Sequence, residues 1–336
     1  MSKHVLLTGG AGFIGSHTVE HILKNTDWNI TVIDRLTYAG DLSRLTDIEG
    51  WQEYAKRVRF VYHDFRASFP NSRVTRSFIR AFGCPNYLIH MGAESHVDRS
   101  INDPLLFAES NVIGTVNMLN LGRSLGVEKF IYVSTDEVYG PSVNGHLHVE
   151  GEPHKPGNPY SASKSAGESF CYAFYNTYDF PVIITNTMNN FGERQEPEKF
   201  VPKTLKALIE RKPVTVHVKK DENGLVTDIS SRCWLHARNH ADALLFLLEH
   251  GQPGERYNVT GERVDVASMA YRIGNYAGVR PELVYEDFHS FRPGHDMHYG
   301  LDGGKLSALG WKPKFTLEKS LQRTVEWTLA HKEWLL

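Results

Sequence analysis

The chain is poor in cysteine, with three among its 336 residues. This odd and widely spaced set, Cys84, Cys171 and Cys233, predicts neither a disulfide framework nor a structural zinc site, and it favours a reducing compartment. No segment reaches the roughly 18 uninterrupted apolar residues that a membrane-spanning helix needs. The apolar run at residues 5–7 is too short for a secretory signal. We therefore expect a cytoplasmic protein with no membrane partner.

A charge excess of either sign is also absent. The 37 Lys and Arg residues nearly balance 39 Asp and Glu residues, and the formal net charge is −2. With no long-range field to favour it, we expect no nucleic-acid partner. The 17 histidines look scattered. None is expected at metal-ligand spacing beside a second ligand, so no metal site is predicted.

Apolar segments and helical patterns alternate through the first half of the chain. We expect strands at residues 5–7, 30–34, 58–62, 87–90, 129–133 and 181–185, and helices from Phe13 to about Lys24, at 102–125 and at 159–178. Strands that alternate with helices of this length favour an α/β fold with a doubly wound parallel sheet, the Rossmann type.

The second half predicts a smaller C-terminal lobe. We expect helices at 202–211, 239–250 and 317–335, a strand at 256–259, and a hairpin at 214–219 and 225–229 around Asn223-Gly224. The last helix has Leu317, Leu321, Val325 and Leu329 on one face, so it should pack onto the lobe. We place the Rossmann domain at 1–186, completed by about 233–262, and the lobe at 187–232 and 263–336.

A dinucleotide-binding loop follows the first strand. Gly10-Ala11-Gly12-Phe13-Ile14-Gly15 fits G-x-G-x-x-G and opens a helix, whose N-terminus offers free N–H groups to a pyrophosphate. Asp34 ends the second strand, where a carboxylate accepts from a ribose 2′-OH and repels a 2′-phosphate. NAD is therefore favoured over NADP, although the neighbouring Arg35 leaves that choice open. The alternative, a glycine-rich turn without a ligand, leaves Asp34 unexplained.

Tyr160 and Lys164 stand four residues apart at a predicted helix start, so they share one helix face. A free tyrosine is a poor base at neutral pH, but a nearby ammonium favours the phenolate and lowers the tyrosine pKa. The pair can then take a proton from an alcohol while hydride leaves for a nicotinamide. Many surface helices carry a Tyr and a Lys at this spacing by chance. The dinucleotide loop earlier in the same chain is what favours a catalytic pair over such a chance occurrence.

Thr135-Asp136-Glu137 follows the fifth predicted strand, at the sheet edge where ligands of open α/β folds bind. Adjacent carboxylates repel each other, so one is easily kept protonated. One base and one acid are what a water elimination requires. The plain alternative is a solvated Asp-Glu turn.

Together these motifs resemble the extended short-chain dehydrogenase/reductase superfamily and, more finely, the dTDP-glucose 4,6-dehydratase family. The resemblance extends over nearly the whole chain, through residues 36–40, 93–100, 134–140, 160–164, 189–192, 197–199 and 292–296. It implies a lyase that binds NAD and a nucleotide sugar. Tyr160 would take the 4-OH proton, Glu137 the C5 proton, and Asp136 would protonate the leaving 6-OH. Hydride would leave C4 for NAD and return to C6, giving a 4-keto-6-deoxy sugar.

The resemblance also implies two sets of binding residues. The cofactor would be bound by Gly9, Gly12, Phe13, Ile14, Gly15, Asp34, Arg35, Leu36, Thr37, Asp64, Phe65, Met91, Ala93, Ser95, Ser110, Tyr160, Lys164 and Asn190. The substrate would be bound by Ser95, Thr135, Asn189, Lys199, Arg232, Asn258, Arg292 and His295.

Three features depart from the family pattern. The predicted hairpin is longer than the family's loop before Arg232, and Cys233 stands where the family has an acid. The segment between Gly140 and Tyr160 is shorter than usual, and Met188 occupies a position that tends to be small and polar. These differences leave the nucleotide and the hexose open.

Two other functions are compatible with part of this pattern. A related sugar-nucleotide 4-epimerase or 5,6-dehydratase would share the loop and the Tyr160–Lys164 pair, and a non-enzymatic NAD-binding protein would need only the loop. Asp136-Glu137 argues for the dehydratase. Helices 102–125 and 159–178 carry apolar residues on more than one face, and in the superfamily such helices pair in a dimer, so we expect a homodimer.

Overall fold

The computed structural model describes residues 2–69, 77, 79–287 and 297–336. Its centre is a seven-stranded sheet with the order β11-β6-β5-β4-β1-β2-β3, in which every neighbouring pair is parallel. The strands are β1 (His4–Thr8), β2 (Asn29–Asp34), β3 (Val58–Tyr62), β4 (Tyr87–His90), β5 (Lys129–Thr135), β6 (Val182–Thr187) and β11 (Arg256–Val259). The chain order reverses beside β1, and ligands of such sheets bind at the carboxyl ends of the strands there. The predicted Rossmann fold is confirmed.

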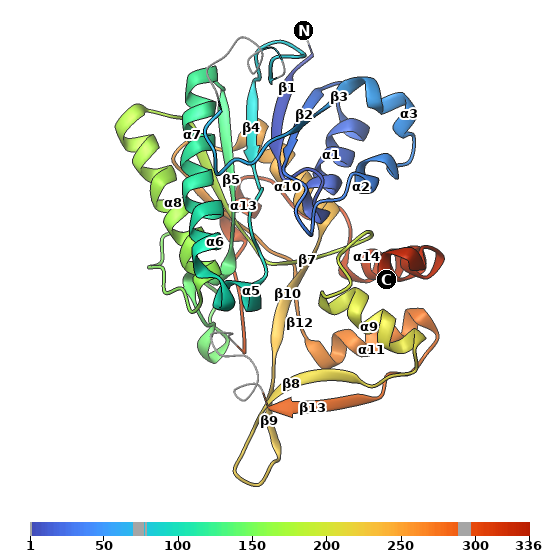
Figure 1. The fold of residues 1–336 in the computed structure, drawn as a ribbon. Coiled ribbons are helices and arrows are strands. Elements are labelled where there is room, and N and C mark those ends of the chain that lie inside the picture. Colours follow the sequence, from blue (N-terminus) through green and yellow to red (C-terminus); the bar gives the residue numbers. More distant parts are fainter. Residues whose placement is uncertain (1, 70–76, 78, 288–296) are drawn as a thin grey trace.

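Helices cover both faces of this sheet (Figure 1). On one face lie α1 (Phe13–Asn25) and α10 (Ala237–His250), and a core containing Val19, Leu23, Leu244 and Leu247 fills the space beneath them. On the other face lie α7 (Gly114–Leu125) and α8 (Pro159–Tyr178), over a second core with Met118, Leu119, Cys171 and Phe174. Short helical segments connect these layers: α2 (Ser43–Thr46), α3 (Trp51–Tyr54), η1 (Ala55–Arg57), α5 (Val97–Asn102), η3 (Asp136–Tyr139) and η4 (Val143–Gly145).

The single helix predicted at 102–125 is wrong at its start. The backbone breaks at Asp103, whose side chain caps α6 (Pro104–Ala108) by accepting from Leu106 N at 3.1 Å. Proline at the first helical position and Asp before it are a helix-start signal, so the chain begins a new helix here. A π-helical turn, η2 (Glu109–Ile113), then joins α6 to α7, which ends at Gly126 in the left-handed conformation, as expected.

The smaller lobe lies beyond the carboxyl ends of the central strands (Figure 1). One of its sheets joins β7 (Asn189–Phe191), β10 (Ser231–His236) and β12 (Glu262–Asp265), and the other joins β8 (Val214–Lys220), β9 (Val226–Ile229) and β13 (Leu283–Asp287). Its helices are α9 (Phe200–Ile209), α11 (Val266–Ala277), α13 (Gly304–Ala308) and α14 (Leu317–Ala330), followed by η5 (Lys332–Leu335). A third apolar core, containing Val201, Leu205, Ile273, Leu321 and Val325, fills the lobe.

The predicted hairpin is confirmed as the antiparallel pair β8–β9, with Val218 opposite Ile229. Its turn is not a two-residue Asn-Gly turn, because five residues separate the strands and Asp221 Oδ1 accepts from both Asn223 N and Leu225 N. The hairpin projects from the lobe (Figure 1). The predicted terminal helix ends earlier than expected, at Ala330, and its Leu317, Leu321 and Val325 are buried in the lobe core.

The two parts of the chain are interleaved. β11 joins the central sheet beside β6, as the proposed division requires. In contrast, β10 pairs with β7 and β12 in the lobe, and Leu306 and Trp311 pack in the core under α1 and α10. The boundary that we propose between domain and lobe stays a prediction, and these two segments show that residues from both sides of it contribute to each part.

No helix in the described part of the chain is long and apolar enough to cross a bilayer. The three cysteines are free thiols, and two of them, Cys171 and Cys233, are buried.

Candidate active site

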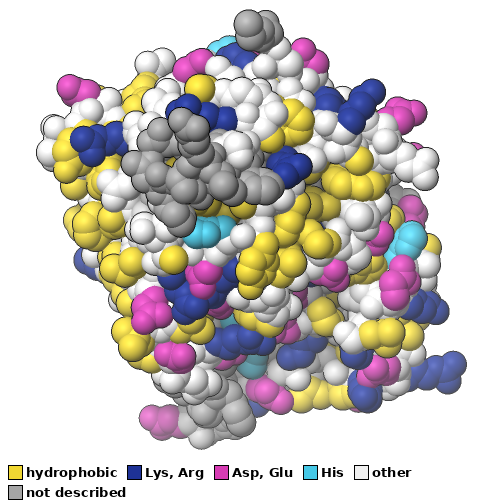
Figure 2. Space-filling view, turned by 45° about the horizontal axis from the view of Figure 1, so that its top comes forward, with side chains coloured by type: hydrophobic (Ala, Val, Ile, Leu, Met, Phe, Trp, Pro, Cys, Tyr) yellow, Lys and Arg dark blue, Asp and Glu magenta, His cyan; other side chains and the backbone are white. Residues whose placement is uncertain are grey.

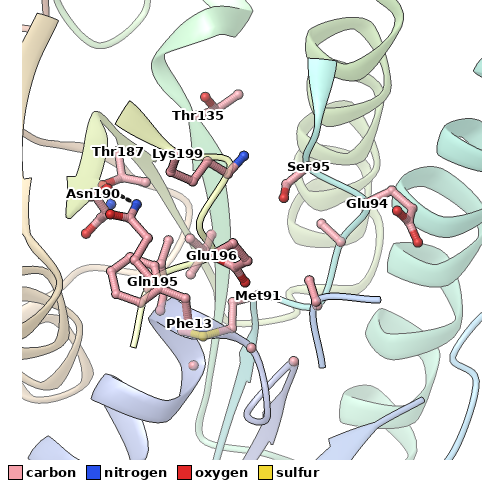
Figure 3. A pocket seen from close by; sticks show the side chains of 18 of the residues that line it. Phe13, Met91, Glu94, Ser95, Thr135, Thr187, Asn190, Gln195, Glu196 and Lys199 are labelled. Carbon is pink, nitrogen blue, oxygen red and sulfur yellow. Dashed lines mark hydrogen bonds between the residues drawn. The ribbon is translucent and has the colours of Figure 1, made fainter. Parts of the chain in front are cut away.

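A cavity of about 330 Å³ opens at the carboxyl ends of the central strands, against the lobe. Residues after β1, β2, β4 and β5 line one side, and residues after β6 line the other. In Figure 3, Lys199 from the lobe and Ser95 from the segment after β4 point toward each other across the opening. The site thus lies between the Rossmann domain and the lobe, as such folds predict.

The glycine-rich loop forms the floor of this cavity. Gly9 has φ +74°, and a Cβ on Gly15 would lie 2.0 Å from Gly9 O, so neither position accepts a side chain without a shift. Gly12 is the cap residue of α1 and supplies no side-chain acceptor to the helix N-terminus. A backbone cradle of this kind, at the positive end of a helix dipole, fits a dinucleotide pyrophosphate.

Asp34 and Arg35 lie side by side in sequence at the cavity and are engaged by different groups. Asp34 lines the cavity and accepts from Ala11 N at 3.0 Å and Leu36 N at 2.9 Å, which fixes its carboxylate. Arg35 is paired with the buried Glu94 and lies 3.3 Å from Asp64. Because two carboxylates already engage its guanidinium, Arg35 is poorly placed to receive a 2′-phosphate.

Thr135 is the last residue of β5, two residues beyond the predicted end of that strand, and Asp136 and Glu137 open η3. Thr135 Oγ1 donates to Asp136 Oδ1 at 3.0 Å, and Asn158 Nδ2 donates to Glu137 Oε2 at 3.1 Å. Asp136 Oδ2 is buried without a hydrogen-bond partner among the described residues.

Asp136 and Glu137 differ in their surroundings. Burial, and then the negative charge of Glu137, raise the pKa of Asp136 to about 7. A carboxyl group with this pKa holds a proton at neutral pH for much of the time, while Glu137 is half-buried and held by an amide. The sequence predicts that one of the two acids is kept protonated because they are adjacent. In the structure, burial raises the pKa of Asp136 more than the neighbouring charge does.

Tyr160 and Lys164 both line the cavity from the first turns of α8. The helix starts as predicted because Asn158 accepts from Ser161 N at 2.9 Å and Pro159 occupies its first position. Lys164 Nζ donates to the Val133 carbonyl at 2.7 Å, and burial lowers the pKa of Lys164 to about 8.

The expected lowering of the Tyr160 pKa is wrong for this structure. Burial and the charge of Glu137 raise the pKa of Tyr160 above its ordinary value, and a hydrogen bond with Thr135 opposes them. The Lys164 ammonium, which was to favour the phenolate, is instead directed to the backbone of β5.

Most residues predicted for the site do line the cavity. They are Gly9, Gly12, Phe13, Ile14, Gly15, Asp34, Arg35, Thr37, Phe65, Met91, Ala93, Ser95, Thr135, Asp136, Glu137, Tyr160, Lys164, Asn189, Asn190 and Lys199. Among them Asn190 donates to Met188 O at 3.0 Å, which orients its amide at the cavity wall.

Five predicted residues do not reach the cavity wall: Leu36, Asp64, Ser110, Arg232 and Asn258. Asn258 does not support the expected substrate contact, because it is fully buried and its amide donates to His148 O and Asp302 O. Arg232 donates to Ser231 O and Met297 O and lies over the ring of Tyr299. Arg292 and His295 lie outside the described residues.

Sequence reasoning missed several polar residues that line the cavity, among them Gln195, Glu196 and Glu198. Glu196 holds Arg44 at 3.3 Å, and Glu198 lies 3.6 Å from His96 and 3.8 Å from Lys199. The sequence held a signal for these residues. Gln195 and Glu196 lie between the Asn189-Asn190 and Pro197-Glu198-Lys199 stretches, both of which resemble the family, and Glu198 lies within the second. Glu94 points away from the opening in Figure 3, and its carboxylate is paired with Arg35.

Two departures from the family pattern turn out to be neighbours. Cys233 and Met188 are both buried in one apolar cluster with Val138, Tyr139, Tyr299 and Leu301. Cys233 is also close enough to Asp136 for the two groups to interact electrostatically. The apolar cluster therefore lies directly behind the Asp136 side of the site.

The histidines are not all scattered, contrary to our expectation. His146, His148 and Glu152 bring their ligand atoms within 4.8 Å of one another. The spacing was overlooked because it fits neither a helix nor a strand. A turn, in which Glu152 N donates to Val149 O, folds the carboxylate back onto both rings.

The arrangement of Tyr160 and Lys164 above a glycine-rich loop is that of the extended short-chain dehydrogenases/reductases, and fold and site together place the protein in this class. More narrowly, the chain belongs to the family described as GDP-mannose 4,6 dehydratase, whose model matches residues 6–324. The family resemblance expected from the sequence is thereby confirmed.

Individual relatives agree with this assignment. The dTDP-glucose 4,6-dehydratase of Salmonella typhimurium is 37% identical over 98% of this chain and 94% of its own length. That of Neisseria meningitidis is 36% identical over 99% and 95%. Among solved structures, the dTDP-glucose 4,6-dehydratase of Streptomyces venezuelae with NAD bound has a TM-score of 0.84 and 32% identity, and 98% of each chain is covered. A UDP-glucose 4-epimerase of Thermus thermophilus has a TM-score of 0.81 and 29% identity over 96% of this chain and 98% of that one.

Proposed function

We propose that this protein is an NAD-dependent nucleotide-sugar 4,6-dehydratase, a hydro-lyase acting on dTDP-glucose or a closely related NDP-hexose. The observation that carries the proposal is that Tyr160, Asp136 and Glu137 line a single cavity together with the dinucleotide loop. The curated relatives of similar length are dTDP-glucose 4,6-dehydratases, which supports the same reaction.

The chain's own residues would hold NAD at defined places. The Gly9–Gly15 backbone and the α1 N-terminus would receive the pyrophosphate, Asp34 would receive the ribose hydroxyls, and Phe65 and Met91 would line the cofactor. The nicotinamide of a bound NAD would supply the acceptor for the C4 hydride and the donor for its return to C6.

The proton transfers fall to three side chains. Tyr160 Oη would accept the proton of the 4-OH as its phenolate. The hydrogen bond with Thr135 favours that phenolate, and the positive charge of a bound nicotinamide would further oppose the burial and the Glu137 charge that raise the Tyr160 pKa. The 4-ketone acidifies the C5–H bond, and a Glu137 oxygen takes that proton. Asp136 Oδ2 delivers a proton to the departing 6-OH. Because the pKa of Asp136 is raised to about 7, much of this carboxyl group is protonated near neutral pH.

The two acids favour a dehydratase over a 4-epimerase. A 5,6-dehydratase would use the same base and acid, and it differs only because hydride does not return to C6. A 4-epimerase needs the Tyr160–Lys164 pair alone and has no use for an acid beside a base. Burial of Asp136 Oδ2 without a hydrogen-bond partner costs free energy. A role as the acid that protonates the leaving hydroxyl explains why this oxygen is kept without a partner.

The substrate's nucleotide would lie toward the lobe. Lys199 and Asn189 line that end of the cavity and suit a diphosphate and a sugar hydroxyl. Basic and acidic side chains are interspersed on the face shown in Figure 2, which fits a small-molecule substrate better than a polyanion.

We also propose that the enzyme is a cytoplasmic homodimer that pairs through α6, η2 and α8. Leu105, Ile113, Phe170, Tyr175 and Tyr178 expose between 36% and 67% of their surface on these helices. Apolar side chains gather on the left side of Figure 2, over the region that α6 to α8 occupy in Figure 1. Light scattering at micromolar concentration should give a dimeric mass, and a monomer would refute this arrangement.

A panel of nucleotide sugars tests the function. Purified protein is incubated with dTDP-glucose, UDP-glucose and GDP-mannose in deuterated water without added cofactor, and the products are analysed by NMR. A 4-keto-6-deoxy sugar with one solvent deuteron at C5 supports the proposal. Inversion at C4 with the C6 oxygen retained would indicate the epimerase, an exocyclic alkene would indicate the 5,6-dehydratase, and no reaction with any sugar would refute the proposal.

A further inference from the structure

The segment between η3 and α8 carries a group of side chains that the dehydration does not use. His146 Nε2 lies 2.9 Å from Glu152 Oε1, and His148 Nδ1 lies 2.7 Å from Glu152 Oε2. Within the described residues, this is the one group of three or more potential ligands that could surround a metal ion. It lies outside the cavity that holds the catalytic residues.

The backbone around these three residues is well fixed. His148 N donates to Gly300 O at 3.0 Å, and the His148 carbonyl accepts from Asp302 N and from Asn258 Nδ2, both at 2.9 Å. The His148 ring stacks on Tyr139 with 9° between the planes. Glu152 Oε1 accepts from Val149 N at 3.0 Å, which holds the carboxylate toward the rings. The ligand atoms are thus placed by contacts that do not depend on the group itself.

We propose that His146, His148 and Glu152 form a site for a divalent transition-metal ion of the zinc class. Two imidazole nitrogens and one carboxylate oxygen are a common zinc ligand set, with a fourth position left for water. Ligands about 2.0–2.2 Å from one zinc ion lie roughly 3.3–3.6 Å from each other in a tetrahedron. At 2.9 and 2.7 Å, the two His–Glu distances are shorter than that range by about half an ångström, so small outward movements of the side chains complete the site.

Exposure of the three side chains suits reversible loading. The His146 side chain is 52% exposed, while those of Glu152 and His148 are 25% and 11% exposed. An ion can therefore enter past His146 and settle against the buried His148.

A bound ion would stiffen one wall of the active site. Tyr139, on which His148 stacks, lies in η3 with Asp136 and Glu137. The same segment ends at Asn158, which donates to Glu137. We therefore expect metal binding to raise thermal stability without being required for dehydration, so the site does not depend on the proposed function.

Metal titration of the chelator-treated, NAD-loaded protein tests the proposal. Zn²⁺ binding is followed by calorimetry, and Co²⁺ binding by the visible absorption that a tetrahedral site produces. Three variants each remove one ligand: His146→Ala, His148→Phe, which keeps a ring stacked on Tyr139, and Glu152→Gln, which keeps the shape. His331→Ala is the matched control, because His331 and Glu333 form a similar exposed pair at 3.0 Å with no third ligand.

We expect one equivalent of Zn²⁺, affinity that falls about tenfold or more in each ligand variant, and unchanged affinity in His331→Ala. The ligand variants should retain wild-type activity without added metal, which shows that they fold. Absence of stoichiometric binding overturns the proposal, as does binding that survives all three substitutions.

Discussion

The ammonium of Lys164 donates to the carbonyl oxygen of Val133 at 2.7 Å, which ties the first turns of α8 to the carboxyl end of β5. Its Nζ also lies 4.2 Å from the centre of the Tyr132 ring. Lys164 therefore fixes the distance between the helix that carries Tyr160 and the strand that carries Thr135, in addition to supplying a positive charge.

Replacing Lys164 with Met should lower kcat by roughly 10²-fold or more, because both the charge and this anchor are lost. Lys129→Met is a matched control. Lys129 lies on β5, the strand that carries Val133, and it donates to the Glu249 carbonyl at the surface. Steady-state kinetics would show the difference, and an equal loss in both variants would mean that Lys164 acts only through stability.

Replacing Asp136 with Asn should separate the first step of the reaction from the second. Oxidation at C4 persists because Tyr160 is intact, whereas loss of the 6-OH slows by about 10²-fold or more without its acid. In the unaltered protein the elimination rate should fall as pH rises through about 7, where Asp136 loses its proton. Stopped-flow absorbance should show reduced cofactor accumulating in D136N, and rapid turnover without accumulation would contradict the assignment.

The raised pKa of Asp136 also predicts how folding stability changes with pH. A carboxyl whose folded-state pKa is about 7 contributes stability below its unfolded pKa and loses that contribution as pH rises through 7. Asn at this position does not titrate, so the D136N variant does not lose this contribution. Between pH 4 and pH 8 its free energy of unfolding should therefore rise by on the order of 1–4 kcal/mol relative to that of the unaltered protein. Urea denaturation at the two pH values measures it, and parallel pH profiles for both proteins would exclude a protonated Asp136.

Replacing Glu94 with Gln should weaken the preference for NAD. Glu94 engages Arg35 inside the cofactor end of the cavity, and its loss frees the guanidinium for a 2′-phosphate. The ratio of NADP to NAD affinity should rise by about tenfold. Glu109→Gln, which removes a partner of Arg66 instead, should leave the ratio unchanged. Fluorescence titration with both cofactors compares the two variants, and an unchanged ratio in E94Q would show that Arg35 cannot reach the ribose.

Replacing Cys233 with Asp restores the acid that the family has at this position. A second negative charge near Asp136 should raise its pKa further, so the alkaline fall in elimination rate should move up by about one pH unit. Cys233→Ser changes the size and polarity little and adds no charge. A shift of the same size in C233S would assign the effect to packing in the Met188 cluster instead of to charge.

Local signals made part of this structure predictable. The bounds of α8 follow from Asn158 and Pro159 at its start, which fix a helix end without help from distant residues. The end of β5 was placed two residues early, because Ser134 and Thr135 become strand only by pairing with Asn186 and Thr187 of β6. The break at Asp103 was readable as a cap followed by proline and was overlooked.

The features of the site also divide into those that local sequence predicts and those that depend on distant parts of the fold. Glycine spacing, Asp34, and the Thr135-Asp136-Glu137 run lie where their neighbours in sequence imply. The direction of the Lys164 side chain and the burial of Asn258 could not be predicted, because each depends on backbone carbonyls brought close by other parts of the fold. The presence of Cys233 and Met188 in one buried cluster likewise depends on segments that are far apart in sequence.

The position of β11 in the central sheet has a consequence for biosynthesis. β6 receives β11 only after the residues of β7, α9, β8, β9 and β10 have been made, and Leu306 and Trp311 enter the same core later still. During translation the sheet therefore has one open edge while the first part of the lobe emerges. A nascent chain arrested before residue 259 should be a good client for chaperones, and a gene cut between the two parts should yield fragments that fold only when both are present together.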